Sequence, residues 1–288
     1  MDTAAAAALR AKLDIENPAV AMSAHTPLAA KLATEAGFDA IWGSGFELSA
    51  SYAVPDASIL PMGTHLELMR AMAAAQSGPV IADLDTGFGN AVTLSYVMPQ
   101  YEAAGVAAAV IEDKTFPKDS SLRPGGRQEL VRLEEFQGKI EAAKAGSTLV
   151  IARTEALIAG LGQDEALRRG AAYAEAGADA VLIHSKQKTP DEIVSFCRAW
   201  PGAVPLVLVP TNYPQLSFSQ IAALGKVGLV ICGNHAIRAA VAAMRRVFRQ
   251  IRVDGGLAGV EPDIASVADI FALQGDAAMR ALEREYLR

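Results

Sequence analysis

Residues 79–90 read PVIADLDTGFGN, an apolar run that ends in two acids and then breaks at glycines. The first four residues are typical of a buried strand, and a helical pattern follows from Asn90 to Ala104. Asp83 and Asp85 are two positions apart, so on an extended strand their carboxylates point to the same side. Such carboxylates repel each other, which indicates a divalent metal between them. The alternative is a polar loop in which Asp85 caps the next helix.

The same unit of an apolar strand followed by a helix recurs along the whole chain. Strands are expected at residues 18–22, 38–42, 79–83, 107–111, 148–152, 180–183, 205–209 and 229–232. Eight such units without intervening antiparallel strands are typical of an α/β fold, the (β/α)8 TIM barrel. A doubly wound open sheet is the alternative, but no Gly-x-Gly-x-x-Gly follows the first strand, as a dinucleotide site would require.

The domain organisation follows from the length of 288 residues and the 51% content of hydrophobic residues, which suffice for one large core. We therefore expect residues 1–288 to form a single barrel domain, in which 262–288 is a C-terminal helical extension. That extension contains helical patterns at 266–273 and 276–287 and no further strand. These helices are expected to pack outside the barrel or on a partner subunit.

Charge and composition exclude several classes of partner. The net charge is −6 and no basic run occurs, which argues against nucleic acid and against an anionic membrane surface. No apolar run is long enough to span a membrane and the first residues do not resemble a signal peptide, so a cytoplasmic location is expected. Cys197 and Cys232 lack any metal-binding spacing and are expected to be reduced thiols.

Polar residues follow nearly every predicted strand, and in a (β/α)8 barrel the catalytic groups gather at these strand ends. One such residue alone could be a helix cap or a structural ion pair. Together around one mouth they indicate an active site. The strand-end residues are Trp42, Ser44 and Gly45; Asp83 and Asp85; Glu112 and Lys114; Arg153 and Glu155; His184 and Lys186; Thr211 and Asn212; and Asn234 and His235.

The acids of this ring are hard oxygen donors of the kind that Mg²⁺ prefers, and this ion usually keeps several waters and takes only one or two carboxylates directly. The candidate metal ligands are Asp83, Asp85 and Glu112, with Asp56 from a preceding loop.

The remaining groups suit an anion. Arg153, His184 and Lys118 are cationic or donate hydrogen bonds, and the backbone amides of Gly45 and Phe46 could hold a carboxylate or an oxyanion. A metal beside an anion site fits a small 2-oxo acid, whose enolate the metal would stabilise when a bond to C3 breaks. The residues alone therefore predict bond cleavage or formation next to a 2-oxo acid.

A family resemblance rests on five segments of the chain. They are residues 42–45 (WGSG), 83–90 (DLDTGFGN), 112–121 (EDKTFPKDSS), 153–156 (RTEA) and 184–186 (HSK). In combination they closely resemble the phosphoenolpyruvate mutase/isocitrate lyase superfamily, and the likeness extends over nearly the whole chain. Thr154 stands where the superfamily usually has valine, which we interpret as a change in packing beside Arg153.

The resemblance implies roles for individual residues. Asp83 is the expected direct Mg²⁺ ligand, with Asp85, Glu112 and Asp56 bound directly or through waters, and Mn²⁺ or Co²⁺ as possible substitutes. Arg153 and His184 would bind a phosphonyl group, and Lys118, Ser120 and Ser121 would close over it with their loop. Trp42, Ser44, Gly45 and Phe46 would frame the pyruvyl end of the substrate.

The loop also implies which reaction of the superfamily is catalysed. Isocitrate and methylisocitrate lyases carry a cysteine in this loop, whereas here it reads KDSS from Lys118 to Ser121. The mutases have asparagine where this chain has Ser120, and the hydrolases have threonine. The resemblance therefore implies Mg²⁺-dependent hydrolysis of the carbon–phosphorus bond of 3-phosphonopyruvate, with Ser120 favouring capture of the phosphoryl group by water. Ser120 and His184 are both candidates for activating that water.

Other interpretations stay open at this point. They are the mutase reaction, which interconverts phosphonopyruvate and phosphoenolpyruvate, and decarboxylation or lysis of oxaloacetate or another 2-oxo diacid. A sensor or scaffold would not need all four acids. The superfamily commonly forms homodimers or homotetramers that exchange helices between subunits, and the same is expected here. His65 is expected at the surface, and Asn234 and His235 either face the mouth or cap the following helix.

Overall fold

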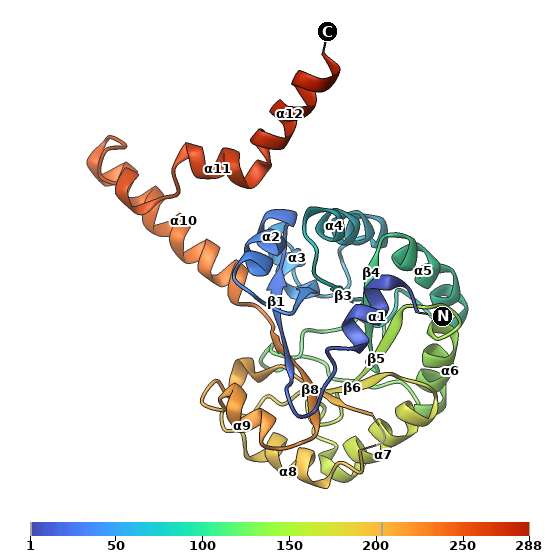
Figure 1. Ribbon diagram of the computed structural model, residues 1–288. Helices are drawn as coiled ribbons and strands as arrows, with labels where there is room; N and C mark the ends of the chain where they lie inside the picture. Colours follow the sequence, from blue (N-terminus) through green and yellow to red (C-terminus); the bar gives the residue numbers. More distant parts are fainter. Residues whose placement is uncertain (1, 203, 288) are drawn as a thin grey trace. The chain divides into compact units, whose positions relative to one another are not determined.

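The computed structural model describes residues 2–202 and 204–287. Eight parallel strands form a closed barrel in sequence order, with helices arranged around it (Figure 1). The predicted (β/α)8 barrel is therefore confirmed. The strands are β1 (Ala19–Ala24), β2 (Ala40–Gly43), β3 (Val80–Asp83), β4 (Val106–Glu112), β5 (Leu149–Thr154), β6 (Ala180–Ile183), β7 (Leu206–Leu208) and β8 (Val227–Cys232).

Helices follow the strands as predicted, and two short segments, Gly45–Ser51 and Pro210–Asn212, are additional. The helices up to β8 are α1 (Ala4–Arg10), α2 (Pro27–Glu35), α3 (Gly45–Ser51), α4 (Met62–Ala75), α5 (Ala91–Ala103), α6 (Leu133–Ala143), α7 (Gly162–Glu175), α8 (Asp191–Ala199), the 3-10 turn η1 (Pro210–Asn212) and α9 (Phe218–Ala222). The chain continues with α10 (His235–Asp254), η2 (Glu261–Asp263), α11 (Val267–Gln274) and α12 (Asp276–Tyr286).

The barrel interior is filled by alternate residues of each strand. In β5, Leu149 and Ile151 belong to the inner hydrophobic cluster, while Val150 and Ala152 pack outward with the residues under the helices. Successive side chains of a strand point to opposite faces. The next inward position of β5 is therefore Arg153, at the carboxyl end of the strand.

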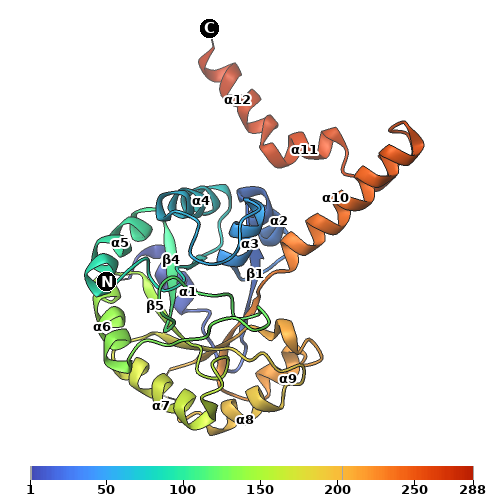
Figure 2. The same cartoon turned by 180° about the vertical axis from the view of Figure 1, so that it is seen from behind.

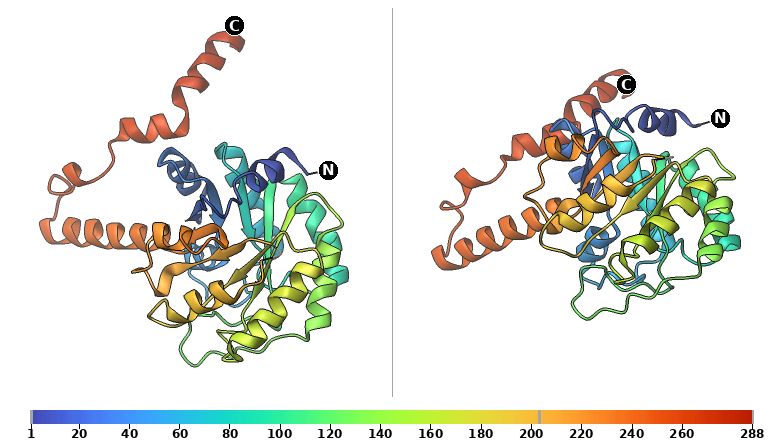
Figure 3. Two further views of the ribbon diagram at one scale, coloured as in Figure 1. Left: turned by 60° about the horizontal axis from the view of Figure 1, so that its bottom comes forward. Right: turned by 90° about the horizontal axis from the view of Figure 1, so that it is seen from below.

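One end of the barrel is closed by α1. Ala6 and Leu9 of this helix are fully buried and belong to the inner cluster. In the side views of Figure 3, α1 lies at one end of the barrel and the loop that follows β4 lies at the other. A ligand can therefore reach the inward-facing residues at the strand ends from the end of the barrel opposite α1.

Helix α3 follows β2 directly, in a stretch for which the sequence predicted no helix. The Ser44 side chain caps this helix, because its hydroxyl accepts a hydrogen bond from the Glu47 amide at 3.3 Å. Glu47 is fully buried. Its carboxylate accepts hydrogen bonds from the Ser23 hydroxyl at 2.7 Å and the Ile237 amide at 3.1 Å. Contacts distant in sequence therefore stabilise a helix that local propensity does not indicate.

The chain divides between Ile237 and Arg238 into two compact units. The first is the barrel, seen from behind in Figure 2. The second comprises most of α10 together with η2, α11 and α12. The expectation of a single domain with an extension from residue 262 stays a prediction. Within residues 2–202 and 204–287, no helix is long and apolar enough to cross a membrane.

Candidate active site

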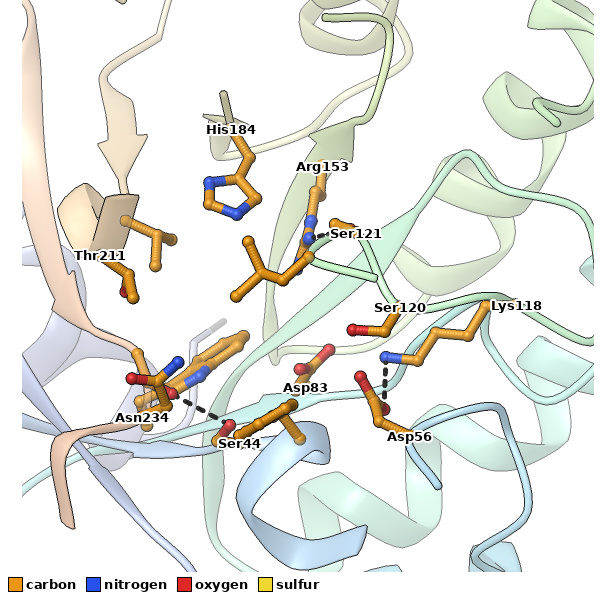
Figure 4. A pocket seen from close by; sticks show the side chains of 15 residues that line it. Ser44, Asp56, Asp83, Lys118, Ser120, Ser121, Arg153, His184, Thr211 and Asn234 are labelled. Carbon is orange, nitrogen blue, oxygen red and sulfur yellow. Dashed lines mark hydrogen bonds and ion pairs between the residues drawn. The ribbon is translucent and has the colours of Figure 1, made fainter. Parts of the chain in front are cut away.

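A pocket lies where the carboxyl ends of the strands meet (Figure 4). Most of the predicted site residues line it. The lining residues are Trp42, Ser44, Phe46, Asp56, Asp83, Lys118, Ser120, Ser121, Leu122, Arg153, His184, Val209, Thr211, Gly233 and Asn234. Three residues with a predicted role, Gly45, Asp85 and Glu112, are not part of this wall but contact residues that are. The strand-end residues without an assigned role that also lie outside it are Lys114, Glu155, Lys186, Asn212 and His235. The structure thus brings the predicted set together at one mouth.

The carboxylates of Asp83 and Asp85 converge on Gly45. The Gly45 amide donates a hydrogen bond to Asp83 Oδ2 at 3.2 Å. A Cβ at this glycine would lie 3.0 Å from Asp85 Oδ1 and 3.2 Å from Asp83 Oδ2. The two acids do meet, although not because both lie on an extended strand: β3 ends at Asp83, and Asp85 has a φ of 53°. The Gly45 amide is therefore engaged by a side chain of the protein.

Lys118 lies among the acids as an internal cation. Its Nζ is 2.5 Å from Asp85 Oδ1 and 3.0 Å from Asp56 Oδ1, and the lysine is almost completely buried. Burial alone would lower the pKa of Lys118, but the surrounding carboxylates, Asp85 first, hold it well above its ordinary value. Burial raises the pKa of Asp85 to about 7 against the attraction of Lys118, with Asp83 and Asp56 adding to the rise. This region therefore holds more negative charge than its own lysine balances.

The surroundings of Glu112 are further evidence for a metal site in this region. Neither of its buried carboxylate oxygens has a hydrogen-bond partner among the described residues, and Arg153 Nε lies 3.4 Å from one of them. Burial raises the pKa of Glu112 despite that arginine. In the described part of the chain no three Asp, Glu, His or Cys residues converge tightly enough to hold an ion by themselves. The acids therefore fit Mg²⁺, which takes one or two carboxylates and completes its shell with water.

Arg153 and His184 lie on one side of the pocket, and Figure 4 shows both apart from Asp56 and Lys118. Burial first, and then the charge of Arg153, lower the pKa of His184 to about 4 against the pull of Glu155. The imidazole is therefore neutral at pH 7. Glu155 and Glu112 hold the pKa of Arg153 above its ordinary value despite burial, so this residue brings a permanent positive charge.

Ser121 is held in place by a network that the sequence did not predict. Its hydroxyl donates to Glu155 Oε2 at 2.5 Å and accepts from Lys114 Nζ at 2.7 Å and Arg153 Nη2 at 2.9 Å. Glu155 also pairs with Lys114 at 3.1 Å and with Arg153 Nε at 2.5 Å. Ser121 lines the pocket as expected, but its hydroxyl is occupied in fixing the loop. Lys114 and Glu155 were recognisable as strand-end residues without an assigned role.

Thr154 and His65 differ from their interpretation in the sequence, and the structure separates Asn234 from His235, for which two alternatives were open. Thr154 is not merely a packing residue, because its hydroxyl donates to the buried carboxylate of Asp113 at 3.1 Å. His65 is not at the surface: it is 4% exposed, and its Nδ1 lies 2.8 Å from the hydroxyl of Tyr101. Asn234 faces the pocket, whereas His235 is exposed at the start of α10.

The pocket also contains residues to which the sequence assigned no role. Leu122 belongs to the loop after β4, and Val209, Thr211 and Gly233 follow β7 and β8. Thr211 was among the predicted strand-end residues. It lies in the 3-10 turn η1, beyond the end of β7 at Leu208, so the turn and not the strand alternation brings it to the pocket.

A closed barrel with carboxylates suited to Mg²⁺ beside a buried arginine and a neutral histidine defines a class of metal-dependent enzymes that act on small anionic acids. Residues 9–252 match the phosphoenolpyruvate phosphomutase family, and the chain belongs to this family.

The chain is similar to phosphonopyruvate hydrolases and to a phosphoenolpyruvate phosphomutase along nearly its whole length. The chain is 68% identical to the phosphonopyruvate hydrolase of Variovorax sp. (strain Pal2) over 98% of both chains. It is similar to a crystal structure of phosphonopyruvate hydrolase in complex with oxalate and Mg²⁺, with a TM-score of 0.94 and 64% identity, over 99% of this chain and 100% of that one. The phosphoenolpyruvate phosphomutase of Streptomyces platensis subsp. rosaceus is 46% identical, with a TM-score of 0.95 over 98% and 99% of the two chains.

Proposed function

We propose that this protein is a Mg²⁺-dependent hydrolase that cleaves the carbon–phosphorus bond of 3-phosphonopyruvate and releases pyruvate and phosphate. The observation that carries the proposal is the pocket itself, which joins a carboxylate group suited to Mg²⁺ to an arginine and a histidine suited to a phosphonyl group. The 68% identity to a phosphonopyruvate hydrolase over nearly the full length supports the same reaction.

The pyruvyl end of the substrate would lie over Asp83. This carboxylate would hold Mg²⁺, with Asp85, Glu112 and Asp56 binding directly or through waters. When bound, Mg²⁺ supplies Lewis-acid stabilisation of the enolate that forms as the carbon–phosphorus bond breaks. A similar crystal structure is a complex with oxalate and Mg²⁺. Because oxalate resembles the enolate of a 2-oxo acid, this complex supports a metal and a 2-oxo acid as ligands of this protein.

The rest of the pyruvyl site comes from the turn between β2 and α3. Trp42, Ser44 and Phe46 line the pocket there. The Gly45 amide already donates to Asp83, so it acts by positioning the metal ligand. The Phe46 amide, in the first turn of α3, is the remaining backbone donor for the substrate carboxylate.

The phosphonyl end would be bound by Arg153 and His184, with Lys118 and Ser120 contributed by the loop after β4. The guanidinium group of Arg153 neutralises the charge of the transferring phosphoryl group. The Lys118 ammonium adds a second positive charge on the loop side. Ser120 presents a hydroxyl smaller than the amide of an asparagine, which leaves room for water next to phosphorus.

Phosphorus NMR of the purified protein with Mg²⁺ and phosphonopyruvate tests the proposal. Phosphate without phosphoenolpyruvate is expected in the phosphorus spectrum, with an equimolar amount of pyruvate in the proton spectrum, and Asp83→Ala should abolish the reaction. Ser120→Asn should lower phosphate release, with Ser120→Thr as the matched control that keeps the hydroxyl. Phosphoenolpyruvate as the main product would instead establish a mutase. No turnover would redirect the test to oxaloacetate and other 2-oxo diacids.

We also propose that the active form is a homodimer or homotetramer in which the C-terminal helices are exchanged between subunits. The C-terminal unit exposes large apolar side chains along all of its helices, and such surfaces mark interaction sites. They include Phe248, Val253, Leu257, Val267, Phe271, Leu282 and Tyr286. Light scattering coupled to gel filtration would measure the mass. A monomer at micromolar concentration would refute this proposal.

A further inference from the structure

Lys139 is a buried lysine that has no role in the proposed reaction. It lies in α6 on the same helix face as Phe136, Ile140 and Ala143, all of them buried, and it is itself 3% exposed. The spacing of these four residues is that of an apolar stripe on a helix. Burial lowers the pKa of the Lys139 ammonium group, and the charge of Glu135 offsets this only in part. An amine therefore occupies a position at which an apolar side chain would be less costly to bury.

The Lys139 side chain contacts the turn that carries one of the proposed metal ligands. Its Nζ donates a hydrogen bond to the Thr86 carbonyl at 3.0 Å, across a separation of 53 residues in the sequence. Thr86 directly follows Asp85 and is fully buried. The hydroxyl of Thr86 has no hydrogen-bond partner among the described residues. The surroundings of this turn thus offer few polar groups, and Lys139 supplies one of them.

The turn at residues 84–88 has a backbone conformation that needs support. Asp85 has a φ of 53° and Phe88 a φ of 60°, in the left-handed region that favours glycine. Between them, Gly87 has a φ of 86°. Residues other than glycine persist in this region only where the surrounding structure determines their conformation. The position of the Asp85 carboxylate therefore depends on the contacts that fix the turn.

Hydrogen bonds hold the carbonyl groups of three successive residues in this turn. The Gly87 amide donates to the Leu84 carbonyl at 2.8 Å, and the Glu112 amide donates to the Asp85 carbonyl at 2.8 Å. The bond to the next carbonyl comes from Lys139. The first two bonds join backbone groups, whereas the third depends on a side chain. A substitution of Lys139 therefore removes one of these supports without changing the residues of the turn.

We propose that Lys139 is a positioning residue of the metal site because it holds the turn that carries Asp85, an inference that rests on the proposed binding of Mg²⁺. Oxygens of Asp85 and Asp83 lie 3.0 Å and 3.2 Å from the position that a Cβ at Gly45 would take, so the two carboxylates converge there. Without the bond from Lys139, the backbone at Asp85 relaxes and its carboxylate moves away from Asp83. Lys139 acts through the backbone and binds neither the ion nor the substrate.

Lys139→Met tests the inference, because methionine has a similar length and cannot donate to the Thr86 carbonyl. Calorimetry with Mg²⁺ in the presence of oxalate measures the metal affinity without turnover. Outer partners of metal ligands typically contribute about 10- to 100-fold to metal affinity. We expect the lower end, a loss of about tenfold, because Lys139 acts through the backbone. Lys12→Met is the matched control: Lys12 follows α1 and pairs with Asp39 at 3.0 Å, and this variant should bind Mg²⁺ as the wild type does.

Two further measurements separate positioning from structural damage. The methionine removes a buried amine but leaves a buried carbonyl unpaired, and these two effects on stability oppose each other. The urea midpoint of the metal-free variant should therefore stay close to that of the wild type. In assays of phosphate release, the Mg²⁺ concentration that gives half of the maximal rate should rise about tenfold. The kcat at saturating Mg²⁺ should be retained, because bound Mg²⁺ restores the position of Asp85.

Weaker Mg²⁺ binding with an unchanged urea midpoint and an unchanged kcat at saturating Mg²⁺ supports the inference. Wild-type Mg²⁺ affinity overturns it, as does a lowered urea midpoint or a fall in kcat that saturating Mg²⁺ does not restore. If methionine prevents folding, Lys139→Gln decides by the same criteria, because its amide nitrogen ends one atom short of the ammonium group.

The wild type distinguishes this inference from the proposed function. Wild-type protein that binds Mg²⁺ with oxalate but releases no phosphate from phosphonopyruvate would refute the hydrolase function, and calorimetry of the Lys139 variants would still decide the role of Lys139. Wild-type protein that binds no Mg²⁺ would refute the metal site and this inference with it.

Discussion

Replacing Glu155 by glutamine tests how strongly the loop network contributes to stability. Glu155 is fully buried and receives hydrogen bonds or ion pairs from Arg153, Lys114 and Ser121. Those cations hold the pKa of Glu155 well below its ordinary value despite burial, so it is charged at every working pH. The substitution therefore removes a negative charge from between two buried positive ones.

The expected loss of unfolding free energy depends on the partners that Arg153 and Lys114 keep in the variant. Removing one partner of a buried ion pair costs about 3–5 kcal/mol. Arg153 keeps Glu112 at 3.4 Å, and Lys114 keeps the Asp119 carbonyl at 2.8 Å. We therefore expect the lower end of the range, about 3 kcal/mol of unfolding free energy. Phosphate release should fall too, because Ser121 and the loop lose their attachment.

Urea unfolding followed by tryptophan fluorescence would measure this loss, since Trp42 and Trp200 are both buried. The protein concentration must be equal for all variants because subunit association also contributes to stability. Glu67→Gln is the control: Glu67 pairs with Arg70 at 2.6 Å on the surface, where a pair contributes at most about 1 kcal/mol. Adding Lys114→Met to Glu155→Gln should recover part of the loss. Equal stability of the Glu155 and Glu67 variants would refute the reasoning.

Three other predictions follow from the contacts around the pocket. Thr154→Val should lower the unfolding free energy by about 1 kcal/mol, because Asp113 loses one of its buried donors; urea unfolding equal to that of the wild type would contradict this. Gly45→Ala should weaken Mg²⁺ binding about tenfold or more by calorimetry, because the new Cβ would lie 3.2 Å from Asp83 Oδ2 and disturb a metal ligand; unchanged affinity would exclude that steric effect. Burial lowers the pKa of His184 to about 4, below its unfolded value, so its stabilising contribution is present above pH 6.5 and is lost as the pH falls toward 4. This loss amounts to about 3 kcal/mol, and His184→Gln should unfold with a correspondingly weaker pH dependence between pH 7 and 4.

The site residues at strand ends could be predicted from two regular features of the fold: the alternation of side chains within each strand and the common direction of the parallel strands. The alternation within β5 and β6 places Arg153 and His184 inside the barrel, and parallel strands bring such positions to one end. Thr211 was named with the other strand-end residues but received no role, because threonine at a strand end is also a common turn residue. The 3-10 turn that brings it to the pocket is not indicated by the alternation of the strand.

Other parts of the site depend on contacts that no local pattern contains. The network at Ser121 requires a loop after β4 to meet Glu155 of the next unit, and nothing in either segment alone fixes their distance. Helix α3 begins with glycine, a poor helix former, and depends on the buried Glu47. His65 was wrongly predicted at the surface, because a histidine in the first turn of a helix does not by itself indicate that core residues pack over it.

The attachment of the loop at Ser121 has a consequence for its conformational entropy. The loop after β4 is also joined at its ends, where Lys114 pairs with Leu130 in a short antiparallel bridge. The loop therefore consists of two short segments, each fixed at both ends, instead of one long segment that is fixed only at its two ends. Fixing a backbone costs about 1–2 kcal/mol per residue, so closing only residues 115–120 over a substrate requires far less ordering than closing the whole loop. Lys118 and Ser120 both belong to that segment, so the entropy lost on closure would be confined to the part of the loop that holds the residues proposed to contact the substrate.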